Sequence, residues 1–322
     1  MHKSYQTCCT IALLFGWQMH ATAQSYPLKP IRLIVATAPG GGVDTTARVL
    51  AKTLTGVIGQ SVVVENRAGA GGVPGTEVLA KSASDGYTIQ LASSSHVVNP
   101  GLYPQLPYDT IKDFTAISLV SRSPNILVVH PSVPAKTVKE LIALAKAQPD
   151  KLNFSSSGGG QASHLAGERF KLMAGVKMVH VPYKGTGPAV IGLLGGEVDL
   201  QFATLPSVLA QIRSNRLKAL GIGSARRSDV LPEVPTISES GVPGFEAGAW
   251  YGVIAPARIA QDIVARLHGA IVKSVDASEV KDALRRDGSD PVGNRPEEFA
   301  AFIASEIPKW AAVVKSAGIK AE

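Results

Sequence analysis

The sequence predicts an α/β protein of two lobes with a ligand cleft between them. From Ile31 onward, apolar strand-like runs alternate with amphipathic helix-like stretches, which is the pattern of βαβ units around a mainly parallel sheet. Two Gly-rich loops lie about 120 residues apart, each between a strand-like and a helix-like run. Ligands of such sheets bind at the carboxyl ends of strands, so two loops in separate halves predict an interlobe cleft.

The first 23 residues have the features of a secretory signal peptide. Lys3 precedes an apolar stretch of about ten residues, and Ala21-Thr22-Ala23 matches a small-residue cleavage motif. A bilayer needs about twenty apolar residues, so we expect cleavage after Ala23 and a periplasmic product without an anchor. Cys8 and Cys9 lie inside this segment, which excludes disulfides and thiol chemistry from the exported chain.

The exported chain has the size and charge of a two-domain binding protein. Its 299 residues suffice for two domains of about 150 residues each. The net charge of the whole chain is +7 and falls to about +6 without Lys3. This charge either steers anionic ligands weakly or only solubilises the surface. Basic residues form no dense block and do not interleave with aromatic ones, so nucleic-acid binding is excluded.

The expected elements fall into two α/β sets followed by a helical tail. Strands are expected at residues 31–36, 62–65, 87–92, 117–120 and 126–130, and then at 153–155, 178–181, 198–202 and 217–221. Helices are expected at residues 45–54, 75–81, 138–148, 163–173, 189–194 and 207–213. Thr137 and Glu140 have the spacing of a capping box, and Pro188 suits a first helical residue.

Residues 225–248 are rich in Pro, Gly and Ser, and we interpret them as a return path between domains. A strand at 250–254 and helices at 261–274, 279–286 and 296–317 should then fold back on the first domain. We therefore assign residues 24–123 and 248–322 to domain 1 and residues 124–247 to domain 2. Hinges are expected near residues 122–124 and 247–250.

The first Gly-rich loop, residues 36–44, is an expected anion site. A helix start leaves its first N–H groups unpaired and partly positive, so it can hold a carboxylate without Arg or Lys. The alternative is a tight turn packed beneath the partner domain. Asp44 is expected mainly as a helix N-cap or first-turn acid, and less as a ligand contact. The expected contacts in this loop are Ala38, Pro39, Gly40, Gly41 and Asp44.

The second loop combines three serines with three glycines before another helix. Hydroxyl and N–H groups together suit a carboxylate. The expected contacts are Ser156, Ser157, Gly158 and Gln161. His164 begins the next helix with no carboxylate at a compelling spacing, so we interpret it as structural rather than catalytic.

Three further polar segments follow strands at the same expected sheet edge. Ser93, Ser94 and Ser95 form a polar loop, and Tyr183 begins a segment that contains Lys184, a cation that either faces ligand or is solvated. The remaining candidate contacts are Ser93, Ser94, Ser95, Tyr183 and Thr204.

Enzyme signatures are absent from the sequence. It has no Gly-x-Gly-x-x-Gly, Walker or nucleophile-elbow motif. The exported histidines lack metal-ligand spacing, so we expect no metal, no cofactor and no enzyme activity.

Short motifs follow one another in a fixed order along nearly the whole exported chain. They are Tyr26-Pro27 with Pro30-Ile31-Arg32, Pro39-Gly40-Gly41 with Asp44, Val64-Glu65-Asn66-Arg67 with Gly69-Ala70-Gly71-Gly72, Asp85-Gly86-Tyr87-Thr88, Asn99-Pro100 before Leu102-Tyr103, Ser156-Ser157-Gly158 through His164-Leu165-Ala166-Gly167-Glu168, and Val181-Pro182-Tyr183-Lys184-Gly185. Each motif is weak alone, whereas the series is highly specific. Together they resemble the Bug-type periplasmic solute-binding proteins of tripartite tricarboxylate transporters.

The resemblance implies a two-domain, type II periplasmic binding fold of the Venus-flytrap kind. Such a protein closes on a small organic acid and delivers it to integral-membrane permease subunits; we expect a monomer. The loops matching residues 36–42 and 156–161 would hold a carboxylate through N–H groups, hydroxyls and ordered water. Many relatives have Asp after the residue matching Phe202, whereas this chain has Ala203, which favours a carboxylate without an amino group.

Other readings remain open at this point. One is a periplasmic receptor for a membrane sensor kinase, which needs the same closing fold. Another is a secreted hydrolase that uses one of Ser155 to Ser157 with His164. The ligand itself is open among a dicarboxylate, an aromatic acid and a neutral relative.

Overall fold

The computed structural model describes residues 26–37, 39–40, 42–158, 160–183, 185–286 and 288–319. The expected signal segment lies outside these residues, as do Ala38, Gly41 and Lys184. Among the described residues, none of the helices is both long and apolar enough to cross a membrane.

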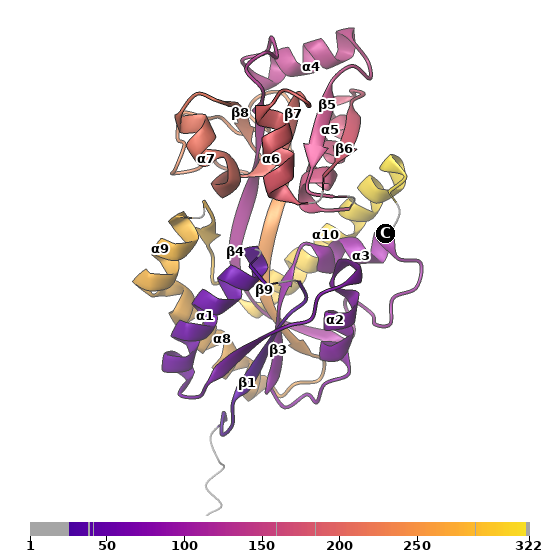
Figure 1. Cartoon of the computed structure of the whole chain (residues 1–322). Coiled ribbons are helices and arrows are strands. Elements are labelled where there is room, and N and C mark those ends of the chain that lie inside the picture. The colour runs from indigo at the N-terminus through magenta and orange to yellow at the C-terminus, as the bar shows by residue number, and fades with distance from the viewer. Residues whose placement is uncertain are drawn as a thin grey trace, which may run out of the picture.

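The described chain forms two α/β lobes, which Figure 1 shows one above the other, with β4 and β9 running between them. In the first lobe the strand order is β2-β1-β3-β9-β4, with β10 also on β4. The pairs of β1 with β2 and β3 are parallel, and β9 is antiparallel to both β3 and β4. These strands are β1 (Ile31–Val35), β2 (Val62–Asn66), β3 (Thr88–Ser93), β4 (Phe114–Val129), β9 (Gly248–Pro256) and β10 (Asp290–Pro291).

The second lobe continues the order as β4-β7-β5-β6, with β8 also on β4. Its further strands are β5 (Asn153–Ser156), β6 (Val179–Pro182), β7 (Leu200–Thr204) and β8 (Lys218–Ile222). Its helices are α4 (Val138–Ala147), α5 (Ala162–Ala174), α6 (Thr186–Leu194) and α7 (Leu205–Arg213). The first lobe contains α1 (Gly42–Ile58), the short helix η1 (Ala70–Gly72), α2 (Val73–Ala80), α3 (Ser95–Leu102), α8 (Gln261–Asp276), α9 (Ser278–Arg286) and α10 (Pro296–Ala317).

Strand β4 links the lobes and corrects one expectation. The two strands expected at 117–120 and 126–130 are a single strand, of which residues 114–124 pair with β9 and residues 125–129 pair with β7 and β8. The polar and Pro residues at 122–124 interrupt the apolar pattern without ending the strand. Opposite them, a Cβ on Gly248 would lie 2.6 Å from the Ser123 carbonyl oxygen, so this close backbone approach requires glycine.

Several helix starts also differ from the expectation, three of them by most. The polar loop expected at 93–95 is the end of β3 and the start of α3, a helix that the sequence analysis missed. Helix α1 begins at Gly42, and α6 begins at Thr186, two residues before Pro188. Pro100 lies inside α3, where Pro normally disfavours a helix, but Val97 and Val98 are buried in the core. Burial against α10 therefore outweighs the local signal.

Helix α4 begins as its capping pattern predicts. The Thr137 side-chain oxygen accepts a hydrogen bond from the Glu140 N–H at 3.1 Å. The Glu140 carboxylate accepts from the Lys136 N–H at 2.6 Å, one residue before the expected N-cap partner. The N-cap at Thr137 is therefore confirmed, but the Glu140 side chain accepts from the Lys136 N–H instead of the Thr137 N–H.

The C-terminal tail packs on the first lobe, as expected. Helix α8 lies against α1, and α10 lies against α3 and β4. Helix α10 also contacts α5 of the second lobe, where the Arg169 guanidinium lies 5.6 Å from the centre of the Trp310 ring. The tail therefore stabilises the first lobe and contacts the second.

Candidate functional site

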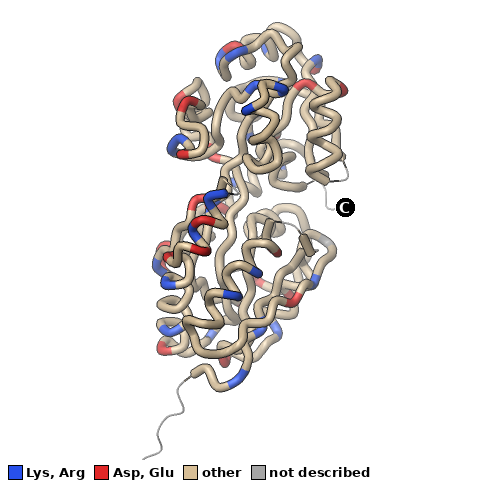
Figure 2. Tube along the Cα trace, turned by 60° about the vertical axis from the view of Figure 1, so that its left-hand side comes forward, with Lys and Arg blue, Asp and Glu red and all other residues tan. Residues whose placement is uncertain are grey.

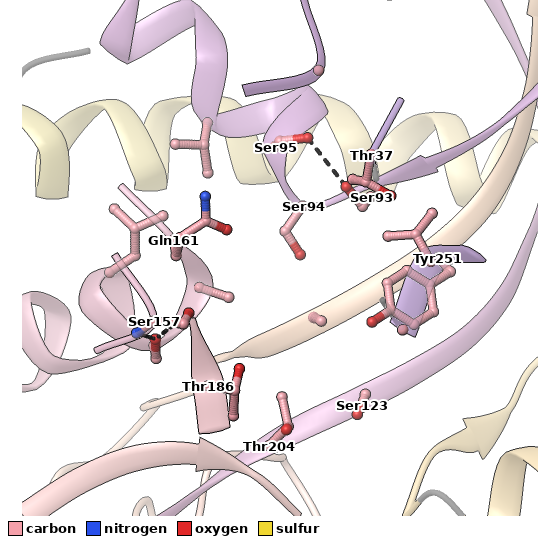
Figure 3. A pocket seen from close by; sticks show the side chains of 18 of the residues that line it. Thr37, Ser93, Ser94, Ser95, Ser123, Ser157, Gln161, Thr186, Thr204 and Tyr251 are labelled. Carbon is pink, nitrogen blue, oxygen red and sulfur yellow. Dashed lines mark hydrogen bonds between the residues drawn. The ribbon is translucent and has the colours of Figure 1, made fainter. Parts of the chain in front are cut away.

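A cavity of about 1040 Å³ lies between the lobes, at the carboxyl ends of their strands. Figure 3 shows hydroxyl and amide side chains from both lobes facing it. Six helices contribute their first residues or N-caps to its lining. These residues are Gly42 and Val43 of α1, Gly72 before α2, Ser95 of α3, Gln161 and Ala162 at α5, Thr186 of α6, and Thr204 and Pro206 at α7.

Among the described residues, the cavity lining contains no Asp, Glu, Lys, Arg or His. Figure 2 shows that charged residues of both signs are distributed along the chain in both lobes. Each helix start carries about half a positive elementary charge. The cleft is therefore electropositive through its backbone, and it suits an anion more than a cation.

The first loop is supported from below by Asp44. Its Oδ2 accepts hydrogen bonds from the Gly40 N–H and from Arg48 Nε, both at 2.9 Å, and its Oδ1 accepts from Asn66 Nδ2 at 3.0 Å. The hydrogen bond from Arg48 is the main reason why the pKa of Asp44 falls to about 2; the bonds from Gly40 and Asn66 lower it further. Asp44 is the third residue of α1, so it acts as a first-turn acid.

The second loop is supported by imidazoles and hydroxyls. The Ser156 hydroxyl hydrogen bonds with His180 Nε2 at 2.6 Å, and the Gly160 N–H donates to His164 Nδ1 at 3.0 Å. The Ser157 N–H donates to the Ser163 hydroxyl at 3.0 Å. All these groups lie on the loop or directly behind it, so they fix its backbone toward the cleft.

The rings of His164 and His180 stack with centroids 3.7 Å apart and 8° between their planes. Burial, and then the nearby His164, lower the pKa of His180 to about 4, so its ring is neutral at pH 7. Because His164 Nδ1 accepts a hydrogen bond, its proton lies on Nε2, which is 3.7 Å from Glu168 Oε1. Burial would raise the pKa of Glu168, but His164 and Lys171 lower it on balance.

Glu168 corrects the statement that His164 has no carboxylate at a compelling spacing. It lies one helical turn beyond His164, where i and i+4 side chains meet. The structural interpretation of His164 nevertheless agrees with its position, since the ring is buried and supports Gly160.

The three serines of the second loop are arranged differently from the hydrolase alternative. The hydroxyl that meets a histidine belongs to Ser156, and it meets His180 rather than His164. Ser156 is fully buried and does not line the cavity. The hydroxyl of the cavity-lining Ser157 hydrogen bonds with the Ser163 hydroxyl and, among the described residues, with no histidine.

The structure brings half of the expected contacts to the cavity. Those that line it are Gly40, Ser93, Ser94, Ser95, Ser157, Gln161 and Thr204. Those that the described structure places outside the lining are Pro39, Asp44, Ser156, Gly158 and Tyr183. Asp44 and Ser156 support the loops from behind, and the Tyr183 hydroxyl donates to Glu197 at 3.0 Å. Ala38 and Gly41 lie outside the described residues.

Several lining residues were missed because they belong to strands rather than loops. Among them are Ser123, Asn125, Gln201 and Tyr251. Thr37 also lines the cavity, but it lies in the first loop, just after β1. A polar residue within an otherwise apolar run, such as Gln201 between Leu200 and Phe202, was the available signal. Tyr251 also lies close to the first loop, because a Cβ on Gly42 would be 2.5 Å from its hydroxyl.

Comparisons with known proteins agree with this architecture. The profile of the tripartite tricarboxylate transporter family receptor matches residues 46–319. Protein BugT of Bordetella pertussis is 43% identical over 301 residues, which cover 93% of this chain and 92% of that protein.

Solved structures of similar proteins include two with organic acids. R. palustris Rpa4515 with adipate is 34% identical, with a TM-score of 0.78 over 92% of this chain and 99% of that one. MatC from Rhodopseudomonas palustris with bound malate is 32% identical, with a TM-score of 0.75 over 90% of this chain and all of that one. This chain therefore belongs to the tripartite tricarboxylate transporter receptor family, whose Bug-type members are periplasmic solute-binding proteins.

Proposed function

We propose that this protein is a periplasmic receptor that captures a small organic carboxylate and delivers it to integral-membrane permease subunits. The observation that carries this proposal is the cleft itself, in which six helix starts converge and no described lining residue is charged. Backbone N–H groups at helix starts bind carboxylates, as they bind phosphate and sulfate. Adipate and malate in two related structures support the same ligand class.

Capture would proceed by closure of the lobes without covalent chemistry. In this account the first loop fixes one carboxylate, and closure brings the second loop onto it. Residues 24–123 with 248–322 and residues 124–247 would move as the two bodies, because β4 changes its partners between Pro124 and Asn125. A ligand shifts the population toward the closed state only if it binds that state more tightly.

The rear of the hinge offers contacts that such a motion would change. Arg226 of the second lobe lies 3.3 Å from Asp290 of the first, and Arg169 lies over the Trp310 ring. Both pairs join residues on opposite sides of the proposed boundary. Small-angle scattering with and without ligand tests the motion; an unchanged radius of gyration at saturation would contradict closure.

A thermal-shift screen tests the ligand class. The protein without residues 1–23, refolded to remove co-purified ligand, is mixed with di- and tricarboxylates, aromatic acids, amino acids and nicotinate-like compounds. We expect a saturable shift for one carboxylate class and none for the corresponding methyl esters. Equal shifts for acid and ester would contradict recognition of the anion.

A further inference from the structure

The cavity wall contains buried polar atoms without a hydrogen-bond partner among the described residues. They are Thr37 Oγ1, Asn125 Oδ1, and both Oε1 and Nε2 of Gln201. Asn125 and Gln201 are 0% exposed. A buried polar group left unpaired is strongly unfavourable, and native proteins rarely keep one without a reason. At a ligand cavity, the missing partner is either a group of the ligand or an ordered water.

The orientation of the Asn125 amide is set by its neighbour. Its Nδ2 donates to the Phe202 carbonyl oxygen at 3.1 Å, and only the nitrogen end of the amide could do so. The other end is therefore the oxygen, which can only accept. Asn125 Oδ1 thus requires an N–H or O–H group from the cavity side.

Gln201 lies on β7 with its Cα opposite Val128 of β4. Its neighbours along the strand are Leu200 and Phe202, and both lie fully in the apolar core. The Gln201 side chain is on the other face of β7, the face of the buried Val128 and Ala203, at the point where this face meets the cavity. Both of its amide atoms lack a partner among the described residues, so it has a donor and an acceptor to offer.

The charges in and near the cavity limit which chemical group of a ligand can pair with Asn125 and Gln201. A second carboxylate could accept from Gln201 but could not donate to Asn125 Oδ1. An ammonium group could donate, yet no described lining residue is acidic, and Ala203 lies beside Gln201 in the wall. A buried ammonium would therefore remain unpaired.

We propose that the ligand carries, besides its carboxylate, an uncharged hydrogen-bond donor, a hydroxyl or an amide N–H, that pairs with Asn125 and Gln201. The inference rests on the proposed carboxylate receptor and narrows its substrate class to hydroxy acids and amide-bearing acids. Asn125 and Gln201 are then specificity-determining residues.

Isothermal titration with matched acids tests this inference. The probes are succinate, malate and succinamate as one set, adipate and its monoamide as a second, and benzoate, 4-hydroxybenzoate and 4-carbamoylbenzoate as a third. Within at least one set we expect the member with a neutral donor to bind at least about tenfold more tightly than the plain acid, because a site built for a donor rejects its absence. Equal affinities within every set that binds would overturn the inference and leave the carboxylate receptor standing. Failure of every acid to bind would overturn both.

Two variants assign the preference to these side chains. Gln201→Leu keeps the size of the side chain and removes both unpaired atoms, so the empty protein should melt at a higher temperature while the tenfold preference falls to about twofold or less. Asn125→Leu should abolish the same preference. Gln211→Leu, on α7 and outside the cavity lining, is the matched control and should keep it. A preference that survives in both Gln201→Leu and Asn125→Leu would overturn the assignment.

Discussion

The two Gly-rich loops have similar sequences and opposite kinds of support. The first loop is held by an ionised carboxylate, Asp44, which accepts hydrogen bonds from Gly40, Arg48 and Asn66. The second is held by neutral imidazoles and hydroxyls, chiefly His180 and His164. In both loops the supporting side chains, ionised in the first and neutral in the second, lie behind the backbone and do not occupy the cleft.

The largest effect should come from removing the support of the first loop. Asp44→Ala leaves three donors without an acceptor, and we expect a loss of about 3 kcal/mol in the free energy of unfolding, because hydrogen bonds to charged groups are strong. Asp44→Asn keeps one oxygen acceptor and should lose about half as much. Urea unfolding measures both, and a loss below about 0.5 kcal/mol for Asp44→Ala would contradict the proposed support.

Lowering the pH should weaken the support of the second loop before that of the first. The pKa of His180 is about 4 in the folded protein and 6.5 in the unfolded chain, so between these values the unfolded state binds more protons. His180 therefore contributes stability that is complete above pH 6.5 and is lost as the pH falls toward 4. Asp44, with its pKa lowered from 3.8 to about 2, keeps its contribution until the pH falls below about 4.

Urea unfolding at pH 7.5 and pH 5.0 checks this difference. The loss of stability between the two values should be smaller in His180→Gln than in the wild type by about 1 to 2 kcal/mol. His96, a buried histidine of the first lobe with its pKa also lowered to about 4 by burial, contributes equally to both proteins and cancels in this comparison. Identical pH dependence in the two proteins would contradict a neutral His180 behind the second loop.

A smaller effect should follow from a methyl group in the first loop. Gly42→Ala would place a Cβ 2.5 Å from the Tyr251 hydroxyl, so we expect a loss of about 1 to 2 kcal/mol and weaker ligand binding. Tyr251→Phe and the double variant complete a cycle in which the double variant should recover part of the loss. Strictly additive losses of stability would show that residue 42 and Tyr251 do not interact.

The smallest effect should be that of salt on the ion pair between Arg48 and Asp44. Arg48 pairs with Asp44 from a side chain that is 54% exposed, and salt screens exposed pairs. Raising NaCl from 50 mM to 1 M should therefore narrow the stability difference between the wild type and Arg48→Met. A difference that stays constant over this range would indicate packing rather than charge.

The two loops also show which parts of the site the sequence could predict. Loops of small residues after apolar runs predicted both halves of the cleft, because Gly and helix starts have local signatures. The expectation that Asp44 is a first-turn acid of a helix was also correct, because helix starts have a local sequence signature. Helix α3 was missed because the sequence analysis interpreted residues 93–95 as a polar loop. The helix contains Pro100, which locally disfavours a helix, and its burial depends on α10, about 200 residues further along the chain.

The strand-borne residues of the cleft escaped prediction for a different reason. Gln201 and Asn125 lie within apolar runs, and their unpaired atoms become visible only when strands β4 and β7 are paired. Likewise, the contact between His164 and Glu168 is local, but the stacking of His180 on His164 joins β6 to α5.

The central claim is that two loops, one from each lobe, converge on one ligand carboxylate without a charged side chain. A crystal structure of the protein with the acid that gives the largest thermal shift tests it most directly. We predict that the carboxylate accepts hydrogen bonds from main-chain N–H groups or hydroxyls of residues 38–45 and of residues 157–163 together. A carboxylate paired with an Arg or Lys side chain, or held by one loop alone in a closed cleft, would contradict the account.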